Sequence, residues 1–252
     1  MTTKTRRRLG VGFWSFILLM LALTGLFAWL GMWQLERLAE KEALIAEVDH
    51  QLTQKPYDLP PSDQWGLIDL ETYAYHPMNV TGHYLSDKTV LVFTSLSTAK
   101  GRFSGPGYWV MTPFVSDEGG TIFVNRGFIP QSSASSFAAG KGGADGPQSF
   151  TGIALKPEGA GAFTPGPDKI KRIEWIRDPL RLAAMAEPPG PVFGLTIDAP
   201  AGDAGALPQG GETIIEFPNN HFGYALTWFG FALLTPALLA YWVFRQLRPA
   251  KA

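Results

Sequence analysis

The residue whose type and position most clearly suggest a chemical role is His221. It lies in the segment PNNHFGY at residues 218–224. Asn219 and Asn220 are both suitable N-cap residues, so the segment predicts that His221 lies in the first turn of a helix. A neutral imidazole is a common axial ligand of haem iron. The sequence therefore makes His221 a candidate metal ligand at the start of a helix.

The helical face of His221 carries Tyr224, Ala225, Trp228 and Ala232 at spacings that bring side chains together on one side of a helix. The small residues would let a flat macrocycle approach, and the aromatic residues could pack on it. An ionisable residue near membrane depth is a functional candidate by default. Two plainer interpretations stay open: a histidine in the headgroup zone of a membrane, or one that hydrogen-bonds to Tyr224.

Two arginines are further candidates. Arg37 could bind an anionic group through charge-assisted hydrogen bonds, which are the strong kind. Its plainer interpretation is an ion pair with Glu40 one helical turn away, which contributes only tenths of a kcal/mol. Arg126 ends a predicted strand, and we expect it to form an ion pair or to cap carbonyl groups inside its own domain.

Other kinds of chemistry lack a matching pattern in this chain. The other histidines, His50, His76 and His83, do not have the spacing of a metal-binding helix motif, and no nucleophile elbow or phosphate-binding loop occurs. There are no cysteines, which excludes disulfides, thiolate metal sites and covalent haem attachment. We therefore do not expect an enzyme.

Two stretches without charged residues, at 9–35 and 222–244, are each long enough to cross a bilayer, which needs about 20 apolar residues. The first is too long for the apolar part of a signal peptide. Trp29 and Trp33 suit the aromatic belt at a membrane interface. Beyond the first stretch, an apolar pattern of helical period continues to about Val48, which predicts that the helix extends out of the membrane.

Basic residues set the expected orientation. Both ends of the chain carry only basic charges, whereas all 22 acidic residues lie between Glu36 and Glu216. Basic flanks favour the cytoplasm, so we expect both termini inside a bacterial inner membrane and an acidic domain in the periplasm. An acidic domain also argues against nucleic acid as a partner. The expected organisation is a tail at 1–8, a transmembrane helix at 9–35, a periplasmic domain at 36–218, a second transmembrane helix at 219–244 and a tail at 245–252.

The central domain is predicted to be β-rich, because short segments of alternating β-branched and aromatic residues are bounded by turn residues. The expected strands are 78–84, 89–94, 108–115, 121–129, 149–156, 173–176, 192–197 and 213–217. A short helix is expected at 180–186 after Pro179. Flexible loops are expected at 131–148, 157–167 and 199–211. This α+β pattern predicts an antiparallel barrel or sandwich between two transmembrane helices, with the closure of the sheet left open.

Three segments, in order, give the chain a family resemblance. LGMWQLERLAEK at 30–41, VNRGFIP at 124–130 and NNHFGYALTWF at 219–229 resemble the signatures of the surfeit-locus cytochrome c oxidase assembly proteins. Phe128 stands where tryptophan is more usual in that family. The matching motif residues are Trp33, Gln34, Arg37, Lys41, Asn125, Arg126, Gly127, Asn220, His221, Tyr224, Thr227 and Trp228.

The resemblance implies a membrane chaperone that helps to build the catalytic subunit of a haem-copper cytochrome c oxidase. It also implies transient binding of haem a, with His221 as the implicated iron ligand. The expected partners are that catalytic subunit, membrane lipid and, as a further candidate, haem a synthase. The alternatives are a scaffold that stabilises an assembly intermediate without touching haem, or an enzyme of the haem pathway. The absence of any nucleophile–base pattern disfavours the enzyme.

Overall fold

The chain divides into two compact units in the computed structural model, which describes residues 10–143, 146–212, 215 and 217–248. We call Met1–Glu47 with Glu216–Ala252 the helical unit, and Val48–Ile215 the β unit. The expected tail at 1–8 and the last residues of the expected tail at 245–252 lie outside the described residues.

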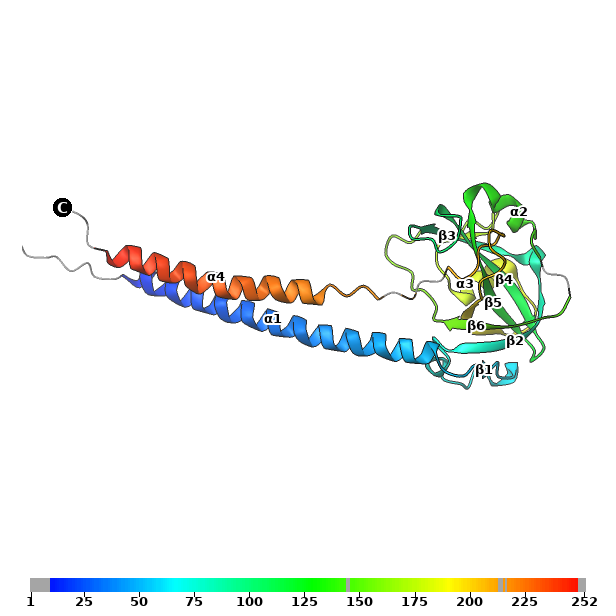
Figure 1. Cartoon of the computed structure of the whole chain (residues 1–252), viewed down its shortest axis with the longest axis horizontal. Coiled ribbons are helices and arrows are strands. Elements are labelled where there is room, and N and C mark those ends of the chain that lie inside the picture. The colour runs from blue at the N-terminus through cyan, green and yellow to red at the C-terminus, as the bar shows by residue number, and fades with distance from the viewer. Residues whose placement is uncertain (1–9, 144–145, 213–214, 216, 249–252) are drawn as a thin grey trace, which may run out of the picture. The chain divides into compact units, whose positions relative to one another are not determined.

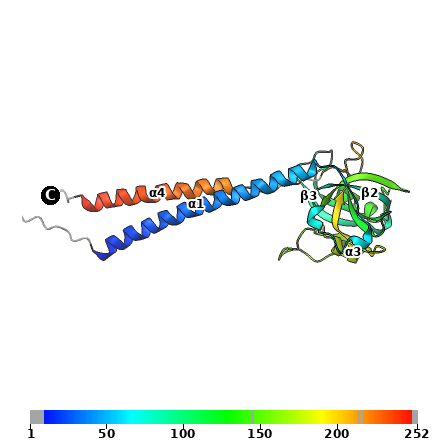
Figure 2. The ribbon, with the colours of Figure 1, turned by 90° about the horizontal axis from the view of Figure 1, so that it is seen from below.

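The helical unit consists of two long helices, α1 (Val11–Leu52) and α4 (His221–Leu247), which lie side by side (Figures 1 and 2). They are antiparallel: the ring of Phe13 near the start of α1 stacks on Trp242 near the end of α4, with centroids 5.2 Å apart. The helical pattern expected to continue to about Val48 is confirmed, since α1 ends only at Leu52.

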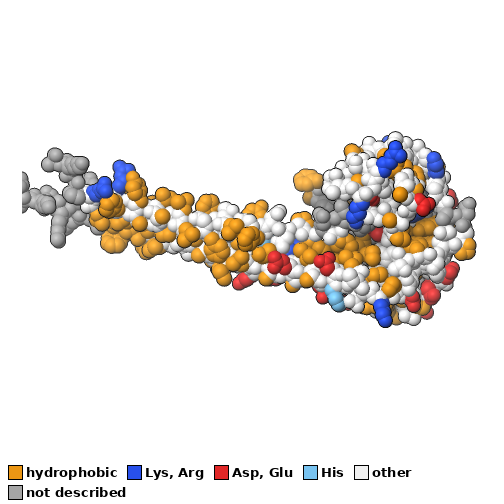
Figure 3. Space-filling view, viewed as in Figure 1, with side chains coloured by type: hydrophobic (Ala, Val, Ile, Leu, Met, Phe, Trp, Pro, Cys, Tyr) orange, Lys and Arg blue, Asp and Glu red, His pale blue; other side chains and the backbone are white. Residues whose placement is uncertain are grey.

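Both helices expose much of their apolar surface. Leu18 is 68% exposed and Leu233 is 75% exposed. Hydrophobic side chains cover most of the visible face of the pair, and basic side chains gather at the end where α4 ends (Figure 3). Exposed apolar area costs about 25 cal/mol per Å² in water, so this surface suits an apolar surrounding. By length and composition, α1 and α4 are the two candidate membrane-spanning helices among the described residues.

The β unit contains one mixed sheet in the order β1-β2-β6-β8-β5-β4-β3-β7. Its strands are β1 (Tyr57–Asp58), β2 (Pro77–Tyr84), β3 (Val90–Leu96), β4 (Gly105–Ser116), β5 (Thr121–Pro130), β6 (Gln148–Leu155), β7 (Ile173–Glu174) and β8 (Val192–Asp198). The strand expectations between 78 and 197 are confirmed to within a few residues, although β7 is shorter than expected. The strand expected at 213–217 falls largely outside the described residues.

The sheet closes into a barrel because β2 pairs with β6 along most of its length and with β4 at its end. The barrel expectation is therefore confirmed and the sandwich is not. The expectation of a purely antiparallel sheet is wrong: β5 and β8 pair in parallel, as do two short edge pairs. Parallel neighbours need a long crossover, and the segment between β5 and β8 provides one.

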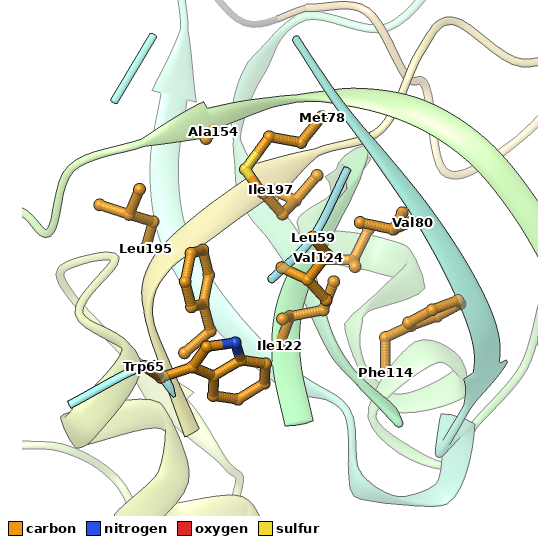
Figure 4. Packing of buried hydrophobic residues seen from close by; sticks show 11 residues of the cluster. Leu59, Trp65, Met78, Val80, Phe114, Ile122, Val124, Ala154, Leu195 and Ile197 are labelled. Carbon is orange, nitrogen blue, oxygen red and sulfur yellow. The ribbon is translucent and has the colours of Figure 1, made fainter. Parts of the chain in front are cut away.

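Buried side chains of the β unit form three clusters, the third of which contains Phe137. The barrel interior is filled by the cluster of Figure 4: Leu59, Trp65, Met78, Val80, Phe114, Ile122, Val124, Ala154, Phe193, Leu195 and Ile197. On the outside of β3 to β5, α3 (Pro179–Ala186) covers a second cluster through Leu182. The helix expected at 180–186 is thus confirmed, and Asp178 caps its first turn.

One predicted loop is partly helical. Residues 131–148 were expected to form a flexible loop because of their small and polar composition, but they contain α2 (Ala134–Ala138). Phe137 of α2 is 4% exposed and packs on Leu91, Val110 and Ile129. The buried Phe137 ring anchors this short helix in a segment whose average composition favours a loop. Residues 157–167, another expected loop, carry no helix or strand.

Candidate functional site

His221 and Gln34 form a hydrogen bond between the two helices of the helical unit. Nδ1 of His221 lies 2.7 Å from Oε1 of Gln34. An amide oxygen only accepts, so Nδ1–H donates, and in the neutral ring the lone pair remains on Nε2. Within the described part of the chain, Nε2 has no hydrogen-bond partner. The arrangement leaves Nε2 free to bind a metal.

The start of α4 places His221 as predicted. Asn220 occupies the N-cap position without a side-chain cap bond, and His221 is the first helical residue. The amide of Tyr224 donates to the carbonyl of Asn220 (3.3 Å), which is the first turn of the helix. His221 stands at the helix end and is half-buried.

Gln34 is 8% exposed, although it lies in a helix with candidate membrane-spanning character. One turn earlier, Gly31 contacts Phe229: a Cβ on Gly31 would lie 2.7 Å from the Phe229 ring. Small residues at such contacts let helix backbones approach closely. The close approach at Gly31 brings the Gln34 side chain within reach of His221.

The other residues of the predicted His221 face differ in their surroundings. Ala225 is 1% exposed, and the ring of Trp228 stacks on Phe27 of α1 with centroids 5.8 Å apart. These two residues therefore contribute to helix packing in this structure. Tyr224, by contrast, is 57% exposed and leaves its ring free to contact a ligand beside His221. Thr227 donates to the carbonyl of Gly223 in its own helix (3.0 Å).

Two cations lie farther along α1. Arg37 pairs with Glu40 at 2.5 Å, and both side chains are more than half exposed. An exposed pair of this kind contributes little to stability. Lys41 lies two helical turns beyond Gln34 on the same face, and its ammonium is 5.1 Å from the centroid of the Phe217 ring. Trp33 is 43% exposed on this helix.

The second motif forms a bulge in the barrel. Between the pairs Trp109–Phe128 and Met111–Asn125, β5 contains one more residue than β4. Gly127 has φ +126°, which favours glycine, and its amide donates to Oδ1 of the buried Asn125 (3.1 Å).

Arg126 donates to the carbonyl of Gly142, and its guanidinium lies 4.9 Å from the centroid of the Tyr84 ring. This is the carbonyl-capping role expected from the sequence. Burial raises the pKa of the Tyr84 hydroxyl to about 12, against the opposing effect of the positive Arg126. Burial also lowers the pKa of Arg126. Motif residues Asn125, Arg126 and Gly127 thus shape the β unit.

Other sites offer less. A cavity of about 500 Å³ is lined by residues that include His83, Tyr84, Asp87 and Asp117. His76 is buried and stacks on Tyr57. No group of three histidine, cysteine or acidic side chains in the described ranges is placed to hold a metal ion. A single exposed imidazole nitrogen fits a metal that brings its own equatorial ligands, as haem iron does.

The sequence pointed to His221 as a candidate but not to Gln34 as its hydrogen-bond partner. In the sequence, Gln34 stands out only as a residue of a family motif. A buried amide in an apolar helix nevertheless needs a hydrogen-bond partner. Its partner lies 187 residues away in the sequence, and no local pattern connects the two.

Comparisons with known proteins cover most of the chain. The SURF1 family model matches residues 21–233. A SURF1-like protein of Monosiga brevicollis is 33% identical over 224 residues, which span 85% of this chain and 81% of the relative. Surfeit locus protein 1 of Rattus norvegicus is 32% identical over 83% of this chain and 69% of the relative. A SURF1-like protein of the bacterium Rickettsia bellii is 29% identical over 81% of this chain and 80% of the relative. The matched region contains the Gln34–His221 pair and the Asn125–Gly127 bulge, and the chain belongs to the SURF1 family.

Proposed function

We propose that this chain is a membrane-anchored, non-enzymatic assembly factor for a haem-copper cytochrome c oxidase, and that it binds haem a for insertion into the catalytic subunit. The observation that carries the haem part is the free Nε2 of His221, whose Nδ1–H is held by Gln34 at 2.7 Å. The family membership supports the assembly part. Bound haem would supply an iron that accepts a nitrogen ligand, together with two anionic propionates.

His221 would hold the iron through Nε2, and the exposed ring of Tyr224 would pack beside the haem. Trp228 lies two turns farther along α4, where it stacks on Phe27, and would add a second aromatic contact to the haem. Arg37, now paired with Glu40, would hold a propionate by a charge-assisted hydrogen bond. The aromatic residues would pack on the apolar macrocycle, and the Arg37 cation would pair with its anionic edge.

The proposed location is a bacterial inner membrane with α1 and α4 spanning it and both termini in the cytoplasm. The basic residues of both chain ends and the exposed apolar surface of the two helices support this. Partners are then the oxidase catalytic subunit, surrounding lipid and haem a synthase as the source of the haem.

A scaffold that stabilises an assembly intermediate without haem is the second candidate. It is favoured by the protein partners that several candidate residues already have: Ala225 and Trp228 pack toward α1, and Arg37 pairs with Glu40. In this interpretation, the Gln34–His221 bond only joins the helices.

The deciding experiment is to purify the protein from cells that make haem a and to record its absorption spectrum. We expect a bound-haem spectrum that is lost in His221→Ala, with the variant still inserted in the membrane. A colourless wild-type protein that still restores oxidase activity in a deletion strain would contradict haem binding and support the scaffold. Conversion of a haem precursor would instead indicate an enzyme.

A further inference from the structure

Gln34 is buried, and its amide oxygen has one hydrogen-bond partner in the described structure, His221. Leaving a buried polar group without a partner costs free energy, and Oε1 of Gln34 avoids this by accepting from Nδ1 of His221 at 2.7 Å. No other side-chain hydrogen bond within the described helical unit joins α1 to α4; those of Thr24 and Thr235, for example, remain inside their own helices.

We propose that Gln34 is a positioning residue that selects the Nδ1–H tautomer of His221 and fixes the direction of its Nε2 lone pair. The proposal rests on the proposed function for its purpose, because Nε2 is the atom that would bind haem iron. Metal-bound histidines almost always donate their second N–H to an acceptor, which fixes both the tautomer and the ring orientation.

The choice of an amide over a carboxylate has a chemical consequence. A carboxylate acceptor pulls the Nδ1 proton strongly and makes the ring a more basic ligand, whereas a neutral carbonyl oxygen does so weakly. Gln34 therefore orients His221 while leaving its Nε2 a moderately strong electron-pair donor to iron. This suits a carrier that must release its iron ligand when it passes the cofactor on.

The first test uses the haem-free, full-length protein in lipid nanodiscs, with ¹⁵N-labelled histidine and nuclear magnetic resonance. His221→Ala identifies the His221 signals. We expect wild-type His221 to show a protonated Nδ1 and a bare Nε2. Gln34→Leu should shift the ring toward the Nε2–H tautomer that neutral histidine prefers in water, and Gln34→Glu should restore Nδ1–H. A wild-type ring protonated on Nε2, or a Gln34→Leu ring unchanged from the wild type, would overturn the proposal.

The matched control is Thr235→Val. Thr235 is also buried and polar in this helix pair, but it bonds only to the carbonyl of Phe231 in its own helix (2.7 Å). It should leave the His221 signals unchanged. A shift of equal size in Thr235→Val and Gln34→Leu would mean that the tautomer responds to general loosening of the helices, and would also overturn the proposal.

The second test uses haem titration and the midpoint potential of the bound haem. Gln34→Leu should weaken haem binding by about 10- to 100-fold, the usual effect of losing an outer partner of a metal ligand. Gln34→Glu should lose less affinity than Gln34→Leu, because it keeps a hydrogen-bond acceptor, and should lower the midpoint potential, since a more basic ligand favours ferric iron. Equal affinity and potential in all three proteins would contradict the positioning role. A wild-type protein that binds no haem would instead overturn the proposed function, while the tautomer measurement still decides whether Gln34 sets the His221 ring.

Discussion

Gly31 of α1 lies against the ring of Phe229 of α4, so closely that a β-carbon at position 31 would be 2.7 Å from a ring carbon. Such a contact is shorter than carbon atoms tolerate, so any larger residue at position 31 would force the Phe229 ring or the helix backbones to shift. Gln34 lies one turn farther along α1 and reaches His221 from there. The Gly31–Phe229 contact thus sets the helix separation that the hydrogen bond requires.

Gly31→Ala should force the helices apart at this turn and weaken the Gln34–His221 bond. We expect the haem affinity to fall and the His221 ring to lose its preference for Nδ1–H, as in Gln34→Leu. Adding Phe229→Leu to Gly31→Ala should partly restore the haem affinity and the Nδ1–H preference of His221, because a smaller side chain makes room for the methyl group. Gly25→Ala is the control, since nothing lies within 4 Å of a β-carbon there. Unchanged haem binding in Gly31→Ala would contradict this account.

Arg37 and Glu40 offer a test of propionate binding. Arg37→Ala should weaken haem binding by about 1.5–3 kcal/mol, the scale of a charged hydrogen bond, and leave the absorption spectrum unchanged. Glu40→Ala removes the partner that competes for Arg37 at 2.5 Å, so it should strengthen binding or leave it unchanged. Titration of both variants with haem measures the effect. If neither variant differs from the wild type, Arg37 serves only its ion pair with Glu40.

The proposed topology predicts the behaviour of reporter fusions. An enzyme reporter that is active only in the periplasm should be active when inserted near Ala144, in the β unit, and silent when fused after Ala252. The basic charges at both chain ends give the physical reason. A cytoplasmic reporter at the same two positions should give the reverse pattern. Periplasmic activity at the C-terminus would overturn the orientation.

Gly127→Ala should destabilise the β unit. Gly127 has φ +126°, and a β-carbon there would lie 2.3 Å from the carbonyl oxygen of Gln209. Strained backbone of this kind costs about 1–3 kcal/mol, and the clash adds to it. Thermal unfolding of the full chain in detergent, followed by tryptophan fluorescence, should show a lower midpoint. Gly159→Ala, with open space around it, should have no effect. The haem spectrum should persist in both variants, because His221 lies in the helical unit.

Much of the architecture could be predicted from the sequence because it depends on neighbouring residues. Uncharged stretches of sufficient length indicated α1 and α4, and alternation of apolar residues indicated most strands from β2 to β8. The N-cap residues before His221 indicated where α4 begins. Each of these features follows from hydropathy, side-chain period or helix-end chemistry within about a dozen residues.

Only the tertiary structure decided how distant segments meet. The parallel pairing of β5 with β8, the closure of β2 on β4 and the burial of Phe137 of α2 against the sheet depend on contacts across the fold. The same holds for the site: sequence patterns identified His221, but its partner Gln34 is 187 residues away. A glycine that admits a phenylalanine ring, and an amide that must be satisfied once it is buried, acquire their meaning only when the two helices pack.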